Sequence, residues 1–377
     1  MDKFNDKKRR SQEVIQIAIR VRNYEQMNRN IECGAWLKMI ANYELTKKIV
    51  FDANFCNWRF CPMCAMIKAG KTAMQILTMM KYITAEHGKE FIFVTLTAPR
   101  VRKEELKDAI NRYNKAFNNL MKRDEILKMS RGFIRKLEVT YDGEPKITKA
   151  MYEQKKDYFK RRGLRAGDPN PNYDTYFPHF HVVFAVDTSY FKMASRYYVN
   201  REKWLDLWRQ CMRDDSITQV DVRKVKANTD PNELASFDFD VAEFAKYTAK
   251  DADYQKDGAM SQEVFEVFYK TLKGRQLLTF GGLFKDSAKK YKNKELDKYI
   301  DRDETDYYWL LIYNFNFEEN EYNKESILPL DEDFKKIIEL NKSESSKKTA
   351  RSWLFSKAKK NKTKDDKERE QNLYDNK

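Results

Sequence analysis

The chain has 377 residues, 41% of them hydrophobic and 35% charged, and its formal net charge of +15 favours a polyanionic partner, most often nucleic acid. It contains no run of about 20 apolar residues, which excludes a membrane-spanning helix, and its charged residues 1–10 lack the apolar stretch of a secretory signal. We therefore expect a cytoplasmic protein with no membrane partner, whose five cysteines are reduced and available as metal ligands.

Hydrophobic periodicity and turn residues predict alternating helices and strands. In chain order these are a helix over 11–30, a cysteine-rich stretch over 31–70, a helix over 71–87, a strand over 91–97, a helix over 104–127, a strand over 135–141, a strand over 179–186, a helix over 201–212, a strand over 218–225, and helices over 240–254, 262–272 and 330–340. The polar residues 142–176 are interpreted as an inserted loop or ragged hairpin. Gly281 and Gly282 are interpreted as a turn between the last two helices.

The middle of this order, strand–helix–strand–strand–helix–strand, predicts an α+β fold. It fits a central antiparallel sheet of split βαβ type covered by helices. Function does not follow from such an architecture, because one fold hosts many chemistries.

Two of the three histidines, His179 and His181, are one residue apart in the apolar run 178–184. Side chains alternate between the faces of a strand, so both imidazoles point to one face, about 7 Å apart, and can converge on one metal ion. On these residues alone, two structural histidines on a half-buried strand are an equally good interpretation.

The helix predicted over 240–254 carries a second group of reactive side chains. Glu243 and Tyr247 are four residues apart and share a helix face, with Lys250 near the same side. A tyrosine, a carboxylate and a lysine so arranged can supply a nucleophile, a general base and a phosphate contact. The same residue types are common on exposed helix faces, so the group is a weak signal by itself.

Together with residues 93–97, the segments 178–182 and 243–250 resemble, in order, the three motifs of HUH endonucleases. Within that superfamily the chain most resembles the rolling-circle replication initiators of small plasmids from Gram-positive bacteria, in the group with one Tyr and one Glu. The resemblance covers roughly residues 30–290 and includes the stretches 135–141, 220–225 and 281–284.

The resemblance implies a set of roles for the motif residues. His179 and His181 bind Mg²⁺ or Mn²⁺, with Glu138 on the neighbouring strand as the candidate third ligand. Tyr247 attacks one strand of the origin, which leaves a 5′-phosphotyrosine and a free 3′-OH. Glu243 activates water for the second cleavage that ends replication.

Other positions of the predicted helix receive lesser roles. Lys246 and Lys250 are expected to contact phosphate, although a solvated helix face suits Lys246 nearly as well. Tyr254 is interpreted as a packing or DNA-contact residue rather than the nucleophile. The implied partners are plasmid origin DNA, at a single-stranded or cruciform nick site, and a host helicase and polymerase. The oligomeric state is left open, with a dimer as one option.

The cysteines Cys33, Cys56, Cys61 and Cys64 can close a tetrahedral structural Zn²⁺ site. The Cys61-Pro-Met-Cys64 spacing is typical of metal sites, whereas the upstream spacings are looser than in common zinc fingers. Free buried thiols are the alternative. Cys211 is interpreted as a core residue.

The expected domains are an N-terminal helix and cysteine-rich zinc segment over 1–70, an HUH endonuclease domain over 71–255, a C-terminal DNA- or partner-binding region over 256–340, and a basic disordered tail over 341–377. A transposase or relaxase with the same chemistry is an alternative, but relaxases place the nucleophilic Tyr near the N-terminus, before the histidines. A non-catalytic zinc-finger DNA-binding regulator is the alternative from a different class.

Overall fold

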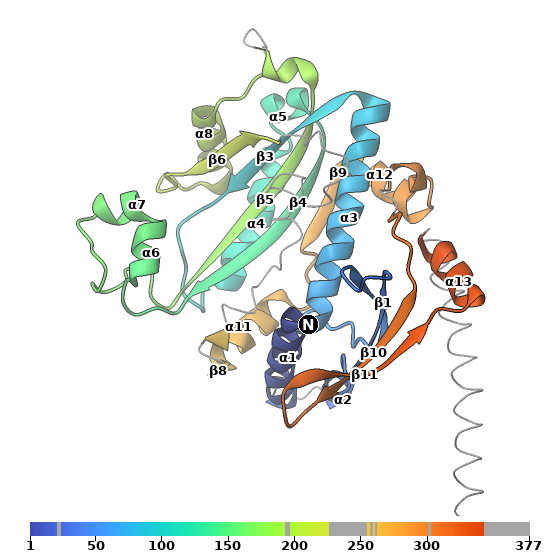
Figure 1. Cartoon of the computed structure of the whole chain (residues 1–377). Helices are drawn as coiled ribbons and strands as arrows, with labels where there is room; N and C mark the ends of the chain where they lie inside the picture. The colour runs from blue at the N-terminus through green and yellow to red at the C-terminus, as the bar shows by residue number, and fades with distance from the viewer. Residues whose placement is uncertain are drawn as a thin grey trace, which may run out of the picture.

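The computed structural model describes residues 1–20, 24–192, 197–225, 255–256, 259–260, 262–300 and 303–342. Within these ranges the strands form a five-stranded sheet, a four-stranded sheet and a two-stranded ribbon, with helices packed around them (Figure 1). No helix of the described chain is long and apolar enough to cross a membrane.

The five-stranded sheet is antiparallel throughout, with the strand order β6-β3-β5-β4-β9. Its strands are β3 (Lys89–Leu96), β4 (Ser130–Asp142), β5 (Thr175–Asp187), β6 (Val220–Lys224) and β9 (Leu278–Gly282). Helix α4 (Leu106–Leu120) connects β3 to β4, and α8 (Arg201–Met212) connects β5 to β6. Because β5 lies between β3 and β4, the first crossover is a split βαβ unit. The predicted α+β fold with an antiparallel sheet is confirmed.

Helices cover both faces of this sheet (Figure 1). On one face α4 and α8 pack against the alternate β5 residues Phe180, Val182 and Phe184. On the other face α3 (Pro62–His87) and α12 (Leu283–Lys292) pack against Val183 and Ala185. The continuous apolar run of β5 follows from this burial on both faces.

Several predicted helices have different limits in the structure, and local chemistry explains both ends of α3. Helix α3 begins at Pro62, nine residues before the predicted start, because proline is favoured in the first helical turn. It ends at Gly88, which adopts the left-handed conformation with φ of 58°. The single helix predicted over 11–30 is wrong: α1 (Asp2–Arg20) and α2 (Tyr24–Ile31) are separate helices.

The four-stranded sheet joins two distant parts of the chain. Its order is β11-β10-β1-β2, and β1 pairs with β10 from Trp36–Asn314 to Ala41–Trp309. The strands are β1 (Trp36–Ala41), β2 (Lys48–Ala53), β10 (Trp309–Asn316) and β11 (Glu321–Pro329). The predicted domain boundaries stay a prediction, although this sheet unites residues from the first and third expected domains.

The remaining elements are α5 (Asp124–Met129), α6 (Lys149–Gln154), α7 (Lys156–Lys160), the 3₁₀ turns Thr188–Phe191 and Asp297–Tyr299, β7 (Gln255–Lys256), β8 (Ala259–Met260), α11 (Gln262–Leu272) and α13 (Glu332–Lys342). Residues 142–176 therefore contain two short helices between the long strands β4 and β5. Most of the expected disordered tail, residues 343–377, lies outside the described residues.

The interpretation of Gly281 and Gly282 as a turn is wrong, because both end the edge strand β9. Glycine is required there by close contact with β4. A Cβ on Gly282 would lie 2.4 Å from the Arg131 carbonyl oxygen, and the residue has φ of 53°. A larger residue would therefore separate the two strands.

Candidate metal centre and cysteine cluster

Strand pairing brings Glu138, His179 and His181 to one face of the five-stranded sheet. Glu138 on β4 is directly opposite His179 on β5, and directly opposed residues of an antiparallel pair share a face. His181, two residues along β5, lies on the same face. All three side chains are buried, with Glu138 only 1% exposed.

The donor atoms of the three residues are close enough to hold one ion. The two Nε2 atoms of the histidines are 3.1 Å apart. Glu138 Oε2 lies 3.3 Å from His181 Nε2 and 4.0 Å from His179 Nε2. All the donors lie within 4.8 Å of one another. Donor atoms at such distances need a shared proton or a cation between them, and a set of two imidazoles and a carboxylate on one buried face fits a metal ion.

Neighbouring groups orient the two imidazole rings. His179 Nδ1 lies 3.1 Å from the Phe177 carbonyl oxygen, which can only accept a hydrogen bond, so Nδ1 donates and Nε2 is left with its lone pair. The Phe177 ring stacks on the His179 ring at 5.1 Å. His181 Nδ1 is 3.3 Å from the Thr95 hydroxyl on β3, so its Nε2 also points to the carboxylate.

The charge of Glu138 suits a metal ligand. Burial would raise the pKa of this carboxyl, but the hydrogen bond with His181 and the charges of His179 and Lys136 outweigh it and lower the pKa to about 2. The carboxylate is therefore ionised at neutral pH. A donor set of two imidazoles and one carboxylate does not select a single ion, so the identity of the metal stays open.

The helix predicted over 240–254 lies outside the described residues. Tyr247, Glu243, Lys246, Lys250 and Tyr254 all lie outside the described residues. Their roles stay predictions.

The sequence prediction missed two polar neighbours of the candidate metal ligands, one buried and one half-buried. Lys136 and Thr95 lie opposite His181 on its two sides, so that a polar row crosses β4, β5 and β3. Lys136 is 4% exposed, which is rare for a lysine. The signal was present in the sequence, since Lys136 and Glu138 alternate with apolar residues in the predicted strand 135–141.

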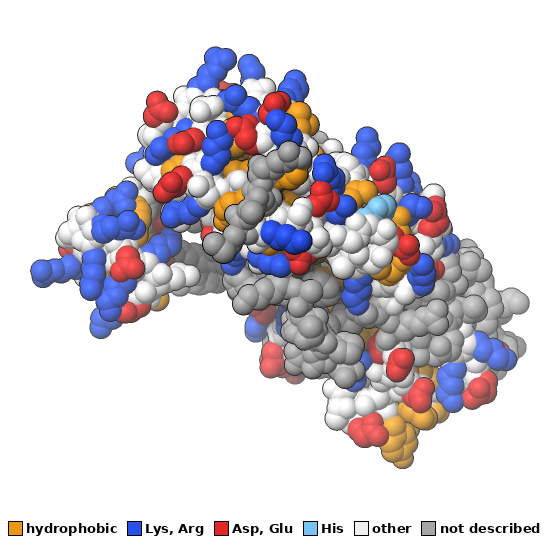
Figure 2. Space-filling model, turned by 90° about the horizontal axis from the view of Figure 1, so that it is seen from above, with side chains coloured by type: hydrophobic (Ala, Val, Ile, Leu, Met, Phe, Trp, Pro, Cys, Tyr) orange, Lys and Arg blue, Asp and Glu red, His pale blue; other side chains and the backbone are white. Residues whose placement is uncertain are grey.

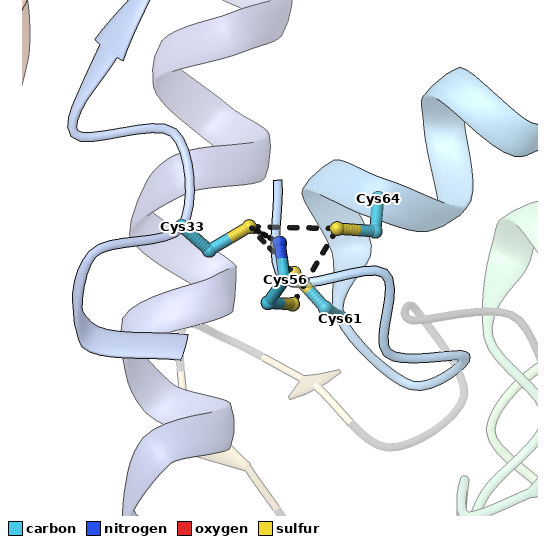
Figure 3. Close-up of side chains that lie close together, drawn as sticks. All are labelled: Cys33, Cys56, Cys61 and Cys64. Atoms are coloured by element: carbon cyan, nitrogen blue, oxygen red, sulfur yellow. Dashed lines mark hydrogen bonds between the residues drawn. The ribbon is translucent and has the colours of Figure 1, made fainter. Parts of the chain in front are cut away.

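The second group of donors is the cysteine cluster, formed by Cys33, Cys56, Cys61 and Cys64 (Figure 3). All four are buried and all four sulfurs lie within 4.8 Å of one another. The separations are 3.6 Å for Cys33–Cys61, 3.5 Å for Cys33–Cys64 and 3.4 Å for Cys56–Cys64. Disulfide sulfurs are about 2.0 Å apart, and tetrahedral zinc ligands about 3.8 Å apart. The spacing fits a metal site and not a disulfide.

The backbone around the cysteine cluster stabilises negative sulfur. The amides of Asn57 and Trp58 donate to Cys64 Sγ at 3.2 Å and Cys56 Sγ at 3.5 Å. Cys61 and Cys64 also lie at the N-terminus of α3, where the helix dipole favours negative charge. Hydrogen bonds from the other cysteines and the Asn57 amide lower the pKa of Cys64 well below its usual range, whereas hydrogen bonds within the cluster and burial raise the pKa of Cys33 and Cys61.

A lysine from α1 completes the surroundings of the cysteine cluster. Lys8 is fully buried and donates hydrogen bonds to the carbonyl oxygens of Cys33 at 2.7 Å and Ile31 at 3.3 Å. Burial lowers the pKa of Lys8, while negative charge on Cys33, Cys61 and Cys56 opposes that effect. Four thiolates around Zn²⁺ carry a net charge of −2, which a buried ammonium group partly offsets.

Comparison with known proteins gives the family. A sequence model of the replication protein family matches residues 47–323, which is more than half of the chain. The chain belongs to the replication protein family. It is 38% identical to "Protein rep" of Staphylococcus aureus over 254 residues, which are 67% of this chain and 95% of that protein. A "Protein rep" of Bacillus amyloliquefaciens is 28% identical over 270 residues, 68% of this chain and 70% of the relative. No solved structure matches the chain.

The family match places the candidate metal ligands within the part of the chain that this replication protein shares with its family. The matched range includes Glu138, His179 and His181, and it includes three of the four cysteines. Cys33 precedes the range. Membership confirms the predicted resemblance to replication initiators, whereas the catalytic roles of single residues stay predictions.

Proposed function

We propose that the protein starts rolling-circle replication of a plasmid by nicking one strand at the double-strand origin, and that it re-joins the strand at termination. The convergence of Glu138, His179 and His181 carries the proposal, because a replication protein has a use for a buried cation beside a phosphodiester. The net charge of +15 supports a DNA substrate.

Each residue has a defined part in the proposed reaction. Glu138, His179 and His181 would hold a divalent ion, Mg²⁺ or Mn²⁺, which when bound polarises the scissile phosphate and takes up developing negative charge. The Tyr247 hydroxyl loses its proton and attacks phosphorus, so that a Tyr247 O–P bond forms while the P–O3′ bond breaks. The departing 3′-oxygen takes up a proton and becomes the primer for a host polymerase behind a host helicase.

The aryl phosphodiester on Tyr247 retains the energy of the broken bond, so the joining step is the reverse of the nicking step. A free tyrosine has a pKa near 10, so Tyr247 requires a nearby base or cation to react at neutral pH. Glu243 serves the second cleavage by activating water. Lys246 and Lys250 contact the phosphates on either side.

The proposal is tested with 5′- and 3′-labelled single strands from the origin of the cognate plasmid. After incubation with Mn²⁺, a denaturing gel is expected to show protein covalently joined to the 5′ end of the downstream fragment, together with a free 3′-OH fragment. Duplex binding with no adduct would support a zinc-finger regulator instead. An adduct that depends on a different tyrosine would support a relaxase-like arrangement.

We propose further that the cysteine cluster holds a structural Zn²⁺ ion. A closed set of four sulfur donors leaves no position for a substrate, which distinguishes it from the three-donor group at Glu138. The cluster lies between α1, α3 and the four-stranded sheet. Tyr322 on β11 donates a hydrogen bond to the Gly34 carbonyl, and Arg59 donates to the Leu272 carbonyl of α11 at 2.8 Å.

Replacing Cys64 with Ser is expected to release zinc and to lower the unfolding free energy by several kcal/mol, which corresponds to a fall in Tm of about 10 °C or more. Zinc content by atomic emission and Tm by calorimetry measure the two effects. Cys211→Ser is the matched control, because Cys211 is also buried but lies in the main core. Wild-type protein that contains no zinc and keeps its Tm in chelator would identify the cluster as free thiols.

A further inference from the structure

The segment between β4 and β5 extends from the end of the sheet that is nearest to the candidate metal centre. The two strands stay paired for four residue pairs beyond Glu138–His179, up to Asp142–Thr175, which places the segment about 13 Å along the sheet from the metal ligands. Figure 1 shows α6 and α7 at the side of the molecule, away from both sheets. We call residues 146–165, which contain both helices, the basic arm.

The basic arm carries a concentrated positive charge. It contains only two acidic residues, Glu153 and Asp157, and eight exposed basic ones, which are Lys146, Lys149, Lys155, Lys156, Lys160, Arg161, Arg162 and Arg165. Among the residues that the structure describes, only Lys156 of these eight forms an ion pair, with Glu153 at 3.2 Å. Figure 2 shows Lys and Arg side chains gathered on the lobe at the left, where α6 and α7 lie. This charge is therefore available to an external polyanion.

The basic arm has regular secondary structure and is not an irregular loop. Phe159 of α7 is fully buried, with the ring of Tyr152 stacked at 6.1 Å and that of Tyr158 edge-on at 5.1 Å. Thr148 caps α6 by accepting a hydrogen bond from the Met151 amide. The basic side chains thus lie on a fixed support.

The orientation of the aromatic rings indicates which form of DNA the arm fits. Proteins that bind single strands stack bases on exposed aromatic rings. In the arm, Phe159 is buried, Tyr152 covers it, and the guanidinium of Arg162 covers Tyr158 at 4.0 Å. None of the three aromatic rings of the arm is fully exposed, and its exposed charged groups are eight cations against two carboxylates, which suits the phosphates of a duplex.

We propose that the basic arm binds the sugar–phosphate backbone of duplex DNA next to the nick site, independently of base sequence. The inference rests on the proposed function for the position of the nick site. The binding itself requires no cleavage, so it can be tested even if nicking fails.

The test is a triple variant, Lys149→Gln, Lys160→Gln and Arg165→Gln, which removes three charges that make no side-chain hydrogen bond within the described chain. Binding to a short duplex of mixed sequence is measured by fluorescence anisotropy over a range of salt concentrations without added divalent ion. We expect the slope of log Kd against log salt to fall by about 3, and the affinity at physiological salt to fall by roughly 10- to 100-fold.

The matched control removes three exposed lysines on the sheet face opposite the candidate metal ligands, with Lys107→Gln and Lys115→Gln on α4 and Lys122→Gln just after it. This variant is expected to keep most of the affinity and the slope. Equal losses in both variants would overturn the proposal by showing a diffuse charge effect. A loss for the single strand as large as that for the duplex would overturn the assignment to duplex DNA. A correctly folded triple variant that binds the duplex with wild-type affinity and salt dependence would also overturn the proposal. Absence of nicking by the wild-type protein would contradict only the proposed function.

Discussion

Replacing Tyr247 with Phe is expected to abolish the covalent protein–DNA adduct and to reduce strand cleavage by at least about 10³-fold. The substitution removes one oxygen and keeps the ring, so the proposed nucleophile is lost with the smallest change of side chain. No other group on the ring can form the phosphodiester. The measurement is the labelled origin strand with Mn²⁺, followed on a denaturing gel and in single-turnover rates.

Two matched variants separate the nucleophile from its neighbours. Tyr254→Phe makes the same change seven residues later and is expected to form the adduct at close to the wild-type rate. Glu243→Ala is expected to form the adduct but to fail in the second cleavage. If Tyr247→Phe still formed the adduct and Tyr254→Phe did not, the two assignments would have to be exchanged.

The grouping of the candidate metal ligands was predictable because strand alternation is a local rule. The spacing of His179 and His181 predicted a shared face, and the strand of Glu138 was recognised from its own alternation. That Glu138 lies beside the two histidines depends on the pairing of β4 with β5. The family resemblance implied this pairing, and the structure shows it in the register Glu138–His179. The same rule applied to Lys136 would have found the buried cation beside the carboxylate.

Features that depend on distant pairing could not be predicted. The four-stranded sheet pairs Trp36 with Asn314, and nothing in the local pattern of either strand identifies its partner. Lys8 stands in a charged stretch that is typical of a solvated helix face, yet it is buried because its ammonium group reaches the carbonyl oxygens behind the cysteine cluster. In both cases tertiary contacts override the local signal.

The two groups of metal donors have different physical characters. In the described chain, the cysteine cluster offers four sulfurs to an ion, and it is surrounded by the elements that it connects. The group at Glu138 offers three donors, which leaves coordination positions for water or a phosphate oxygen. A closed site suits stability and an open one suits catalysis, so removal of metal should affect folding at the first and reaction rate at the second.

Replacing Glu138 with Gln is therefore expected to act on the reaction with little effect on folding. Glutamine keeps the volume and one oxygen, but it removes the charge, which is present at neutral pH because the pKa of Glu138 is about 2. We expect the Mn²⁺ concentration for half-maximal cleavage to rise by at least about 10-fold, and the rate to fall by about 10²- to 10³-fold.

The control for Glu138→Gln is the same substitution at Glu90, which lies on β3 near the far end of the sheet and pairs with Lys224 at 2.8 Å. Glu90→Gln is expected to leave the Mn²⁺ requirement unchanged. Cleavage that stays normal in Glu138→Gln at low Mn²⁺ would show that the carboxylate is not a ligand, and that the two histidines act with a different third group. A fall in rate that excess Mn²⁺ partly restores would place the lost charge at the metal, because a purely structural defect does not respond to the concentration of the ion.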